Sequence, residues 1–122
     1  MFLANKSVIE VIEEHKAMRS PKIIRYLGHK FTILPEVFSP FLAPSGIVNL
    51  TFVSLPIFKN KKVLEIGCGS GIISCLMVLN GAKKVVGVDV NPVAIKNAKI
   101  NAKKLKLDKK TVFLEGNLFD PI

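Results

Sequence analysis

The stretch of residues 62–91 constrains the fold of this chain more than any other part. It contains two short apolar runs, residues 63–66 and 85–88, separated by a glycine-rich turn and the apolar segment 72–79. Runs of this length suit strands of a parallel sheet that are buried on both faces. The segment between them has the length of a helix, and Gly81 is placed to end it. The stretch therefore predicts a strand–helix–strand crossover unit.

Three glycines at alternate positions follow the first predicted strand: Gly67, Gly69 and Gly71. Glycine allows the backbone to turn sharply and allows a ligand to lie against it. The helix that follows would direct its free N–H groups toward that ligand. Asp89 stands at the tip of the second strand, 22 residues after Gly67. Because a carboxylate there can accept hydrogen bonds from two ribose hydroxyls, the pattern predicts a nucleoside-binding loop.

The spacing of the glycines argues against a dinucleotide. Ile72 stands where the NAD fingerprint requires glycine or alanine, so an NAD-binding module is only an outside alternative. Residues 63–71 (VLEIGCGSG) and 88–92 (VDVNP) resemble the first two motifs of the Rossmann-like, or class I, methyltransferases that use S-adenosyl-L-methionine (SAM). The resemblance implies an α/β fold with a parallel sheet, SAM as the cofactor and methyl transfer as the activity.

The resemblance also implies a set of cofactor contacts. Glu65 would anchor the glycine loop near the methionine ammonium, Asp89 would hold the ribose hydroxyls, and the loop after a third strand would contact the adenine. The residues implied are Glu65, Gly67, Cys68, Gly69, Gly71, Asp89, Val90, Asn117 and Leu118. The residues themselves leave simpler roles open, because Glu65 could be a buried carboxylate that braces the loop and Asp89 could cap a helix.

The N-terminal part predicts a helix and a hairpin. Ser7 and Glu10 have the spacing of a capping box, so a helix should begin there and end before Pro21. The β-forming segments 22–27 and 30–34 flank Gly28-His29, which predicts a hairpin with His29 in the turn. His15 is expected on the surface of the helix rather than in a metal site, because no second ligand is placed to join it.

The segment 34–40 (LPEVFSP) resembles the stretch before the sheet in two branches, the release-factor glutamine methyltransferases and the ribosomal-RNA guanine methyltransferases. The parts of interest are its turn Phe38-Ser39-Pro40 and the later Ser45. There they would border the methionine end of SAM, although Phe41 replaces the arginine common in the first branch. A plain hairpin exit packed over the core is the alternative. We expect a helix over residues 45–55, residues 1–44 as an N-terminal extension, and residues 45–122 as the SAM-binding half of a domain.

The C-terminal part predicts a second crossover. Asn91 can cap a helix that begins at Pro92 and runs to about Leu105, and residues 111–115 predict a third strand. In the resembling families an Asn/Asp-Pro-Pro-aromatic motif after a fourth strand grips the acceptor nitrogen, and the sequence holds no such motif. About half of the family's sheet is therefore expected, with a free apolar edge along residues 63–66. A longer polypeptide, a complementing chain and a homo-oligomer are the alternatives for covering it.

The distribution of charge along the chain bears on the kind of substrate or partner it binds. The formal net charge is +9, and residues 59–122 hold 12 of the 18 basic side chains but only 5 of the 9 acidic ones. A lysine-rich face suits RNA, through neutralised phosphates, and it also suits an ordinary solvated helix. The expected function is methyl transfer to a nitrogen of RNA or of a protein glutamine, as in release factors. The alternative is a non-catalytic SAM-binding or RNA-binding remnant.

Two further features of the sequence bear on the cellular location of the protein. Cys68 and Cys75 have neither metal-ligand spacing nor a disulfide framework, which indicates a reducing, cytoplasmic setting. Residues 37–58 carry no charge, but Pro40, Pro44 and Pro56 would interrupt a helix there. We therefore expect this stretch to be buried in the protein and not to enter a membrane.

Overall fold

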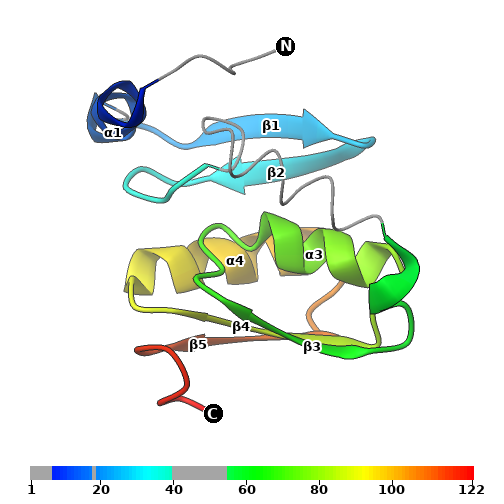
Figure 1. The fold of residues 1–122 in the computed structure, drawn as a ribbon. Coiled ribbons are helices and arrows are strands. Elements are labelled where there is room, and N and C mark those ends of the chain that lie inside the picture. Colours follow the sequence, from blue (N-terminus) through cyan, green and yellow to red (C-terminus); the bar gives the residue numbers. More distant parts are fainter. Residues whose placement is uncertain (1–6, 18, 40–54) are drawn as a thin grey trace.

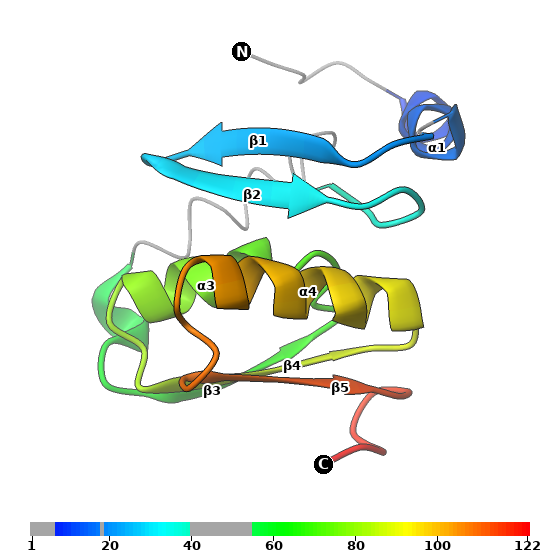
Figure 2. The ribbon, with the colours of Figure 1, turned by 180° about the vertical axis from the view of Figure 1, so that it is seen from behind.

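A computed structural model describes residues 7–17, 19–39 and 55–122 of the chain. The described elements form three stacked layers (Figures 1 and 2). An antiparallel hairpin lies on a layer of two helices, and a three-stranded parallel sheet lies on the other side of those helices. The predicted fold class, an incomplete Rossmann-like α/β sheet preceded by a helix and a hairpin, is confirmed.

Helix α1 spans Val8–Ala17 and begins with the predicted capping box. The Ser7 hydroxyl accepts a hydrogen bond from the Glu10 N–H at 3.2 Å, and the Glu10 carboxylate accepts one from the Ser7 N–H at 2.6 Å. These two bonds satisfy backbone donors that a helix start otherwise leaves without partners.

Strands β1 (Lys22–Tyr26) and β2 (His29–Ile33) form the predicted hairpin. The register pairs Tyr26 with His29, so the turn consists of Leu27 and Gly28 alone. Their φ values are 49° and 80°, as the mirror-image turns of two-residue hairpins require. The prediction that His29 lies in the turn is wrong, because the shorter loop closes one residue earlier and His29 begins β2.

The parallel sheet contains β3 (Lys62–Ile66), β4 (Lys84–Asp89) and β5 (Thr111–Glu115) in that order. Helix α3 (Ile72–Leu79) connects β3 to β4, and α4 (Pro92–Lys104) connects β4 to β5. Both helices lie on the same face of the sheet (Figure 2). A short 3₁₀ turn, Pro56–Phe58, precedes β3. The carboxyl ends of all three strands consequently meet at one edge.

The hydrophobic core lies around the helix layer and draws on all three layers. Cys75 is fully buried there as a small core residue. Gly71 lets α3 and α4 approach closely, because a Cβ atom at this position would lie 2.6 Å from the Ala98 Cβ. The largest fully buried apolar side chains are Phe31, Ile33, Ile72, Leu76, Val37, Val85 and Val88.

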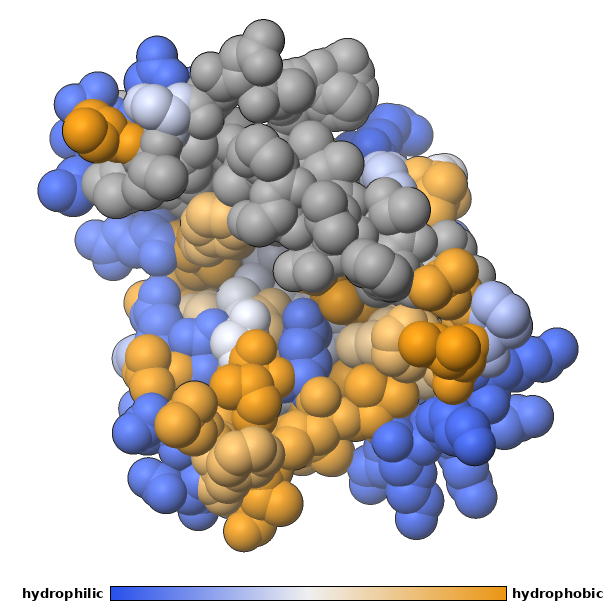
Figure 3. All heavy atoms as spheres, viewed as in Figure 1, coloured by the Kyte–Doolittle hydropathy of each residue, from blue (hydrophilic) through white to orange (hydrophobic). Residues whose placement is uncertain are grey.

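The face of the sheet that points away from the helices differs from the prediction. Leu64 and Ile66 are each 40% exposed, although β3 was predicted to be buried on both faces. The reason is that both crossover helices cover one side and leave the other open. Residues 117–122 turn beneath this side (Figure 1), and Figure 3 shows apolar residues gathered over β3 and this C-terminal segment. We call this surface the open face.

Several expectations fall outside the described residues. Pro40, Phe41, Ser45 and most of the helix predicted over residues 45–55 lie in the segment 40–54, which the structure does not describe. Within the described ranges, none of the helices combines the length and the apolarity that a membrane crossing demands.

Candidate functional site

The glycine loop forms at the carboxyl end of β3. Gly67, Gly69 and Gly71 have φ values of 76°, 53° and 81°, a region that side chains with a Cβ rarely adopt. The N–H groups of Gly67 and Cys68 both donate to the Val88 carbonyl, at 2.7 and 3.0 Å, which ties the loop to β4. Helix α3 begins directly after Gly71, and no side chain caps its first turn from that position.

Asp89 joins the glycine loop to the end of β4. One carboxylate oxygen accepts the Gly69 N–H at 2.9 Å, and the other accepts the Asn91 N–H at 2.9 Å. The Asn91 side chain in turn accepts the Val93 N–H at 2.9 Å, so Asn91 is the cap predicted for α4. Asp89 therefore does not cap a helix itself; it holds the loop and the start of the second crossover at one carboxylate.

Glu65 lies on the helix side of β3 and braces the first turn of α3. Its carboxylate accepts a hydrogen bond from the Ser74 hydroxyl. Burial raises the pKa of the Glu65 carboxyl to about 7, the bonds from Ser74 oppose the increase, and the negative charge of Asp89 adds to it. The site thus holds two neighbouring carboxyls, of which Glu65 is easily protonated near neutral pH.

Cys68 points away from the loop surface. Its side chain is 5% exposed, and a Cβ atom on Gly87 would lie 2.9 Å from the Cys68 Cβ. Burial, together with the charges of Glu65 and Asp89, raises the pKa of the Cys68 thiol to about 12. The thiol is therefore protonated at neutral pH and has no nucleophilic character there.

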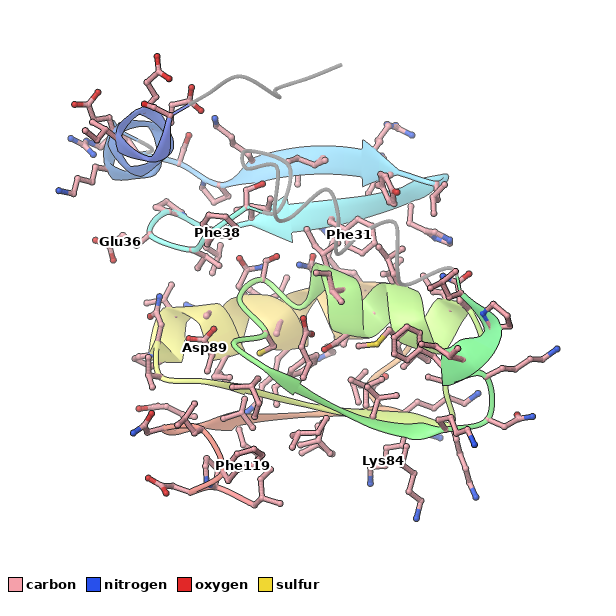
Figure 4. All side chains as sticks on the ribbon, in the orientation of Figure 1. Phe31, Glu36, Phe38, Lys84, Asp89 and Phe119 are labelled. Atoms are coloured by element: carbon pink, nitrogen blue, oxygen red, sulfur yellow. The ribbon has the colours of Figure 1, made fainter. Side chains whose placement is uncertain are left out.

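The exit of the hairpin forms a wall beside the loop. A Cβ atom on Gly69 would lie 3.7 Å from the Phe38 carbonyl oxygen, and the Asn91 side chain donates to the Glu36 carbonyl at 3.3 Å. Figure 4 shows Glu36 and Phe38 on the hairpin side of Asp89. Val37 and Ser39 in the same segment are buried. The segment 36–39 consequently borders the carboxyl edge of the sheet.

The remaining predicted contacts lie at the same edge but on its outer side. The Gly116 N–H donates to the Asp89 carbonyl at 3.0 Å, which places the loop after β5 beside the end of β4. Val90 and Leu118 are 64% and 55% exposed, and Asn117 is exposed as well. The structure thus brings Asp89 into contact with the glycine loop and places Glu65 close enough for the charge of Asp89 to affect it, while Val90, Asn117 and Leu118 lie on the outer side of the edge.

Two residues that the sequence interpretation did not single out are central to this arrangement. Asn97 and Asn101 on α4 are fully buried and bond to the backbone of β2. Their spacing of one helical turn on the apolar side of α4 was the available signal, since amides are seldom fully buried without a specific partner.

The chemistry of the site favours a neutral or cationic ligand with hydroxyl groups. Two carboxyls can accept hydrogen bonds from hydroxyls or pair with an ammonium, and they would repel phosphates. Among the described residues, no three histidine, cysteine, aspartate or glutamate side chains are grouped to hold a metal ion.

The comparisons with known proteins agree that the relatives of this chain are methyltransferases. The sequence model of the family "Ribosomal protein L11 methyltransferase (PrmA)" matches residues 48–121, more than half of the chain. A relative from Methanocaldococcus jannaschii, provisionally named a protein N5-glutamine methyltransferase, is 45% identical over 100 residues. That match covers 82% of this chain and 48% of the relative, so the chain spans about half the length of this curated relative.

Two solved structures extend the comparison. A SAM-dependent methyltransferase from Thiobacillus denitrificans, in complex with S-adenosyl-L-homocysteine, is 25% identical with a TM-score of 0.52, over 64% of this chain and 31% of that one. A structure from Streptococcus mutans, provisionally named a SAM-dependent methyltransferase, shares the fold with a TM-score of 0.67 at 15% identity, over 84% of this chain and 28% of that one. The chain belongs to the ribosomal protein L11 methyltransferase (PrmA) family, within the class I SAM-dependent methyltransferases.

Proposed function

We propose that this chain binds SAM at the carboxyl edge of its sheet and supplies the cofactor half of a methyltransferase. The observation that carries the proposal is the bond between the Asp89 carboxylate and the Gly69 N–H, which unites the two motifs on which the family resemblance rests. The Thiobacillus denitrificans structure, which contains the demethylated product of SAM, supports the same ligand class.

Each site residue has a proposed role. Gly67, Cys68, Gly69 and Gly71 pass along the methionine and ribose with their backbone. Asp89 accepts the ribose hydroxyls, exchanging or sharing its present bonds to backbone N–H groups. Glu65 lies near the methionine ammonium, whose positive charge would favour the ionised carboxylate.

The adenine lies on the outer part of the edge in this proposal. Val90, Asn117 and Leu118 contact it, with the Asn117 amide and a backbone N–H as the polar partners. Their exposure leaves these side chains accessible to a ligand.

The protein's contribution to the reaction is orientation and local charge. The sulfonium of SAM supplies the activated methyl group, so the residues named above need only hold the donor in line with a nucleophile and keep the surrounding charge favourable. The proposed acceptor is a nitrogen of a protein glutamine or of RNA. The name of the Methanocaldococcus jannaschii relative favours the glutamine.

The acceptor half is proposed to come from sequence that this chain does not contain. Residues 1–44 form an extension and residues 45–122 the cofactor half, and the sequence lacks an Asn/Asp-Pro-Pro-aromatic motif. A continuation, a complementing chain or a second copy would cover the apolar edge of β3. We place the protein in the cytoplasm, in line with two free cysteines.

A second candidate function is RNA binding without catalysis. Lysines gather where the three strands begin: Lys62 and Lys84 are neighbours in the register, and the Val85 N–H donates to the carbonyl of Lys110. Like charges on adjacent strands are unfavourable unless an anion offsets them. The lysines at this amino edge are Lys61, Lys62, Lys83, Lys84, Lys109 and Lys110, all exposed.

Calorimetry with SAM, S-adenosylhomocysteine and NAD tests the proposal. We expect heat with the first two and none with NAD. The absence of heat with SAM and its product would refute the cofactor assignment. Methyl transfer from labelled SAM to release factor or ribosomal RNA separates an enzyme from a remnant. The assay is run with and without the part of the Methanocaldococcus jannaschii relative that this chain does not match. Transfer by the 122 residues alone would refute the need for an acceptor half. RNA binding with a steep salt dependence but no transfer would favour the second candidate.

A further inference from the structure

Two buried amides on α4 hold the hairpin. Asn97 and Asn101 are 0% exposed and lie one helical turn apart, facing β2. Strand β1 pairs with one edge of β2. At the other edge, the side-chain amides of the two asparagines form hydrogen bonds with backbone N–H and carbonyl groups. An unpaired strand edge buried against a helix would otherwise carry unsatisfied donors and acceptors.

The two asparagines make different sets of bonds. The Asn97 side-chain oxygen accepts the Leu34 N–H at 2.8 Å, and its amide nitrogen donates to the Thr32 carbonyl at 2.7 Å. The Asn101 oxygen accepts the Thr32 N–H at 2.7 Å, and its nitrogen donates to the Thr32 carbonyl at 2.9 Å. The same Asn101 nitrogen also donates to the Ser70 carbonyl at 2.8 Å. Asn101 therefore also bonds to the glycine loop, whereas the bonds of the Asn97 side chain to described residues all go to the hairpin and its exit.

The hairpin and the loop meet a second time. The segment that leaves β2 passes over Gly69, where the Phe38 carbonyl lies 3.7 Å from the position of a Cβ, and reaches the Asn91 side chain through the Glu36 carbonyl at 3.3 Å. Figure 4 shows Phe38 and Glu36 on this side of Asp89. Displacing the hairpin from α4 would therefore move one wall of the candidate site, and it would strain the bond between the Asn91 side chain and the Glu36 carbonyl.

We infer that Asn101 is a positioning residue that couples docking of the β1–β2 hairpin to the conformation of the glycine loop, so that ligand binding at the loop and hairpin docking stabilise each other. The inference rests on the proposed function, because the ligand is the SAM-type molecule of that proposal. Coupling of this kind is reciprocal: the factor by which docking strengthens binding equals the factor by which binding stabilises docking.

Hydrogen exchange in the unmodified protein tests the coupling directly. The amides of Thr32 and Leu34 both donate to asparagine oxygens, so they exchange only when the hairpin leaves α4. We expect saturating S-adenosylhomocysteine to slow their exchange by about fivefold or more, the lower end of typical couplings. The Phe31 amide, which faces β1 in the hairpin register, serves as the internal reference. Its exchange should change less, because undocking of the hairpin from α4 leaves the pairing of β1 with β2 intact.

Matched variants isolate Asn101. Asn101→Ala and Asn97→Ala remove the same buried group, and each loses bonds to Thr32, but only the first loses the bond to Ser70. We expect Asn101→Ala to bind S-adenosylhomocysteine about tenfold more weakly than Asn97→Ala under conditions where both variants are folded by circular dichroism. If Asn101→Ala does not fold, the exchange measurement on the unmodified protein decides alone.

The outcomes are separable. Ligand binding with unchanged exchange at Thr32 and Leu34, or equal affinities in the two variants, overturns the inference and leaves the proposed function standing. No binding of S-adenosylhomocysteine by the unmodified chain overturns the proposed function and, with it, this inference.

Discussion

The Asp89 carboxylate accepts a hydrogen bond from the N–H of Gly69, so the motif of residues 88–92 and the glycine loop are held together in the free protein. The loop is thus kept in position by the group proposed to bind the ribose. A ligand hydroxyl that approaches Asp89 meets a carboxylate already fixed by two backbone donors. Such preorganisation lowers the entropic cost of binding.

Asp89→Asn should weaken binding of S-adenosylhomocysteine by about tenfold or more, because the amide loses the charge and one of the two acceptor oxygens. Titration calorimetry measures the change. Asp108→Asn is the matched control, since it removes the same charge from an exposed position in the loop before β5. An equal loss of affinity in both variants would show that net charge, and not the site, is responsible.

Gly71→Ala should strongly destabilise the protein, by about 3 kcal/mol or more, because the new Cβ would lie 2.6 Å from the Ala98 Cβ and 2.7 Å from its Cα. Gly67→Ala is the matched control. It has a similar φ of 76° but no atom within 4 Å, so it should cost only about 1–2 kcal/mol of backbone strain. Urea unfolding in the absence of ligand gives both values, and equal midpoints would contradict the close-packing argument.

The raised pKa of Glu65 should make the stability of the protein depend on pH. Its pKa is raised in the folded protein from 4.5 to about 7, so the folded state binds the proton more tightly than the unfolded state does. This group alone therefore makes the free energy of unfolding fall as the pH rises from about 4.5 to 7, with a slope of at most about 1.4 kcal/mol per pH unit. Glu65→Gln should remove that contribution, so the variant should gain stability relative to the natural chain at pH 8 and not at pH 4.

Binding should respond to the same substitution in the opposite direction. If Glu65 pairs with the ligand ammonium, Glu65→Gln stabilises the free protein yet weakens S-adenosylhomocysteine binding. Calorimetry near pH 7 in buffers of different ionisation enthalpy should then show proton release on binding by the natural chain and less by the variant. Proton uptake in the natural chain would contradict the assigned partner.

Leu27→Asn should stabilise the hairpin by up to about 1 kcal/mol, because Leu27 has a φ of 49° in a two-residue turn where asparagine is favoured before glycine. Thermal unfolding followed by circular dichroism measures the effect. Leu27 is 63% exposed, so little apolar contact is lost. Leu27→Ala provides the comparison: an equal gain from alanine would mean that reduced apolar exposure, and not relief of the turn, is the cause.

Local patterns in the sequence predicted local structure well. The capping box of Ser7 and Glu10 and the cap at Asn91 appear as predicted, because each depends on residues within three positions of one another. The third strand, Thr111–Glu115, has the predicted bounds. The hairpin was predicted but its turn was misplaced, since Leu27 is an unusual residue for a positive φ and Gly28-His29 had the more familiar turn composition.

Features that depend on distant residues were not predictable in the same way. The exposure of Leu64 and Ile66 depends on which face each crossover helix covers, and apolar periodicity does not determine that. The buried amides of Asn97 and Asn101 depend on a strand edge 63 to 69 residues away in the chain. The carboxylate of Asp89 was placed at the loop correctly because two adjacent parallel strands must end at the same edge of the sheet.

The docking of the hairpin on α4 also sets an order of events during synthesis. The hairpin can close as soon as residues 22–33 are made, whereas its anchor to Asn101 spans 69 residues of chain. While a ribosome is still extending the chain toward α4, the outer edge of β2 therefore has no asparagines to bond it. Premature contacts at that edge are a hazard for the nascent protein, and slowing translation between β2 and α4 should lower the yield of folded chain.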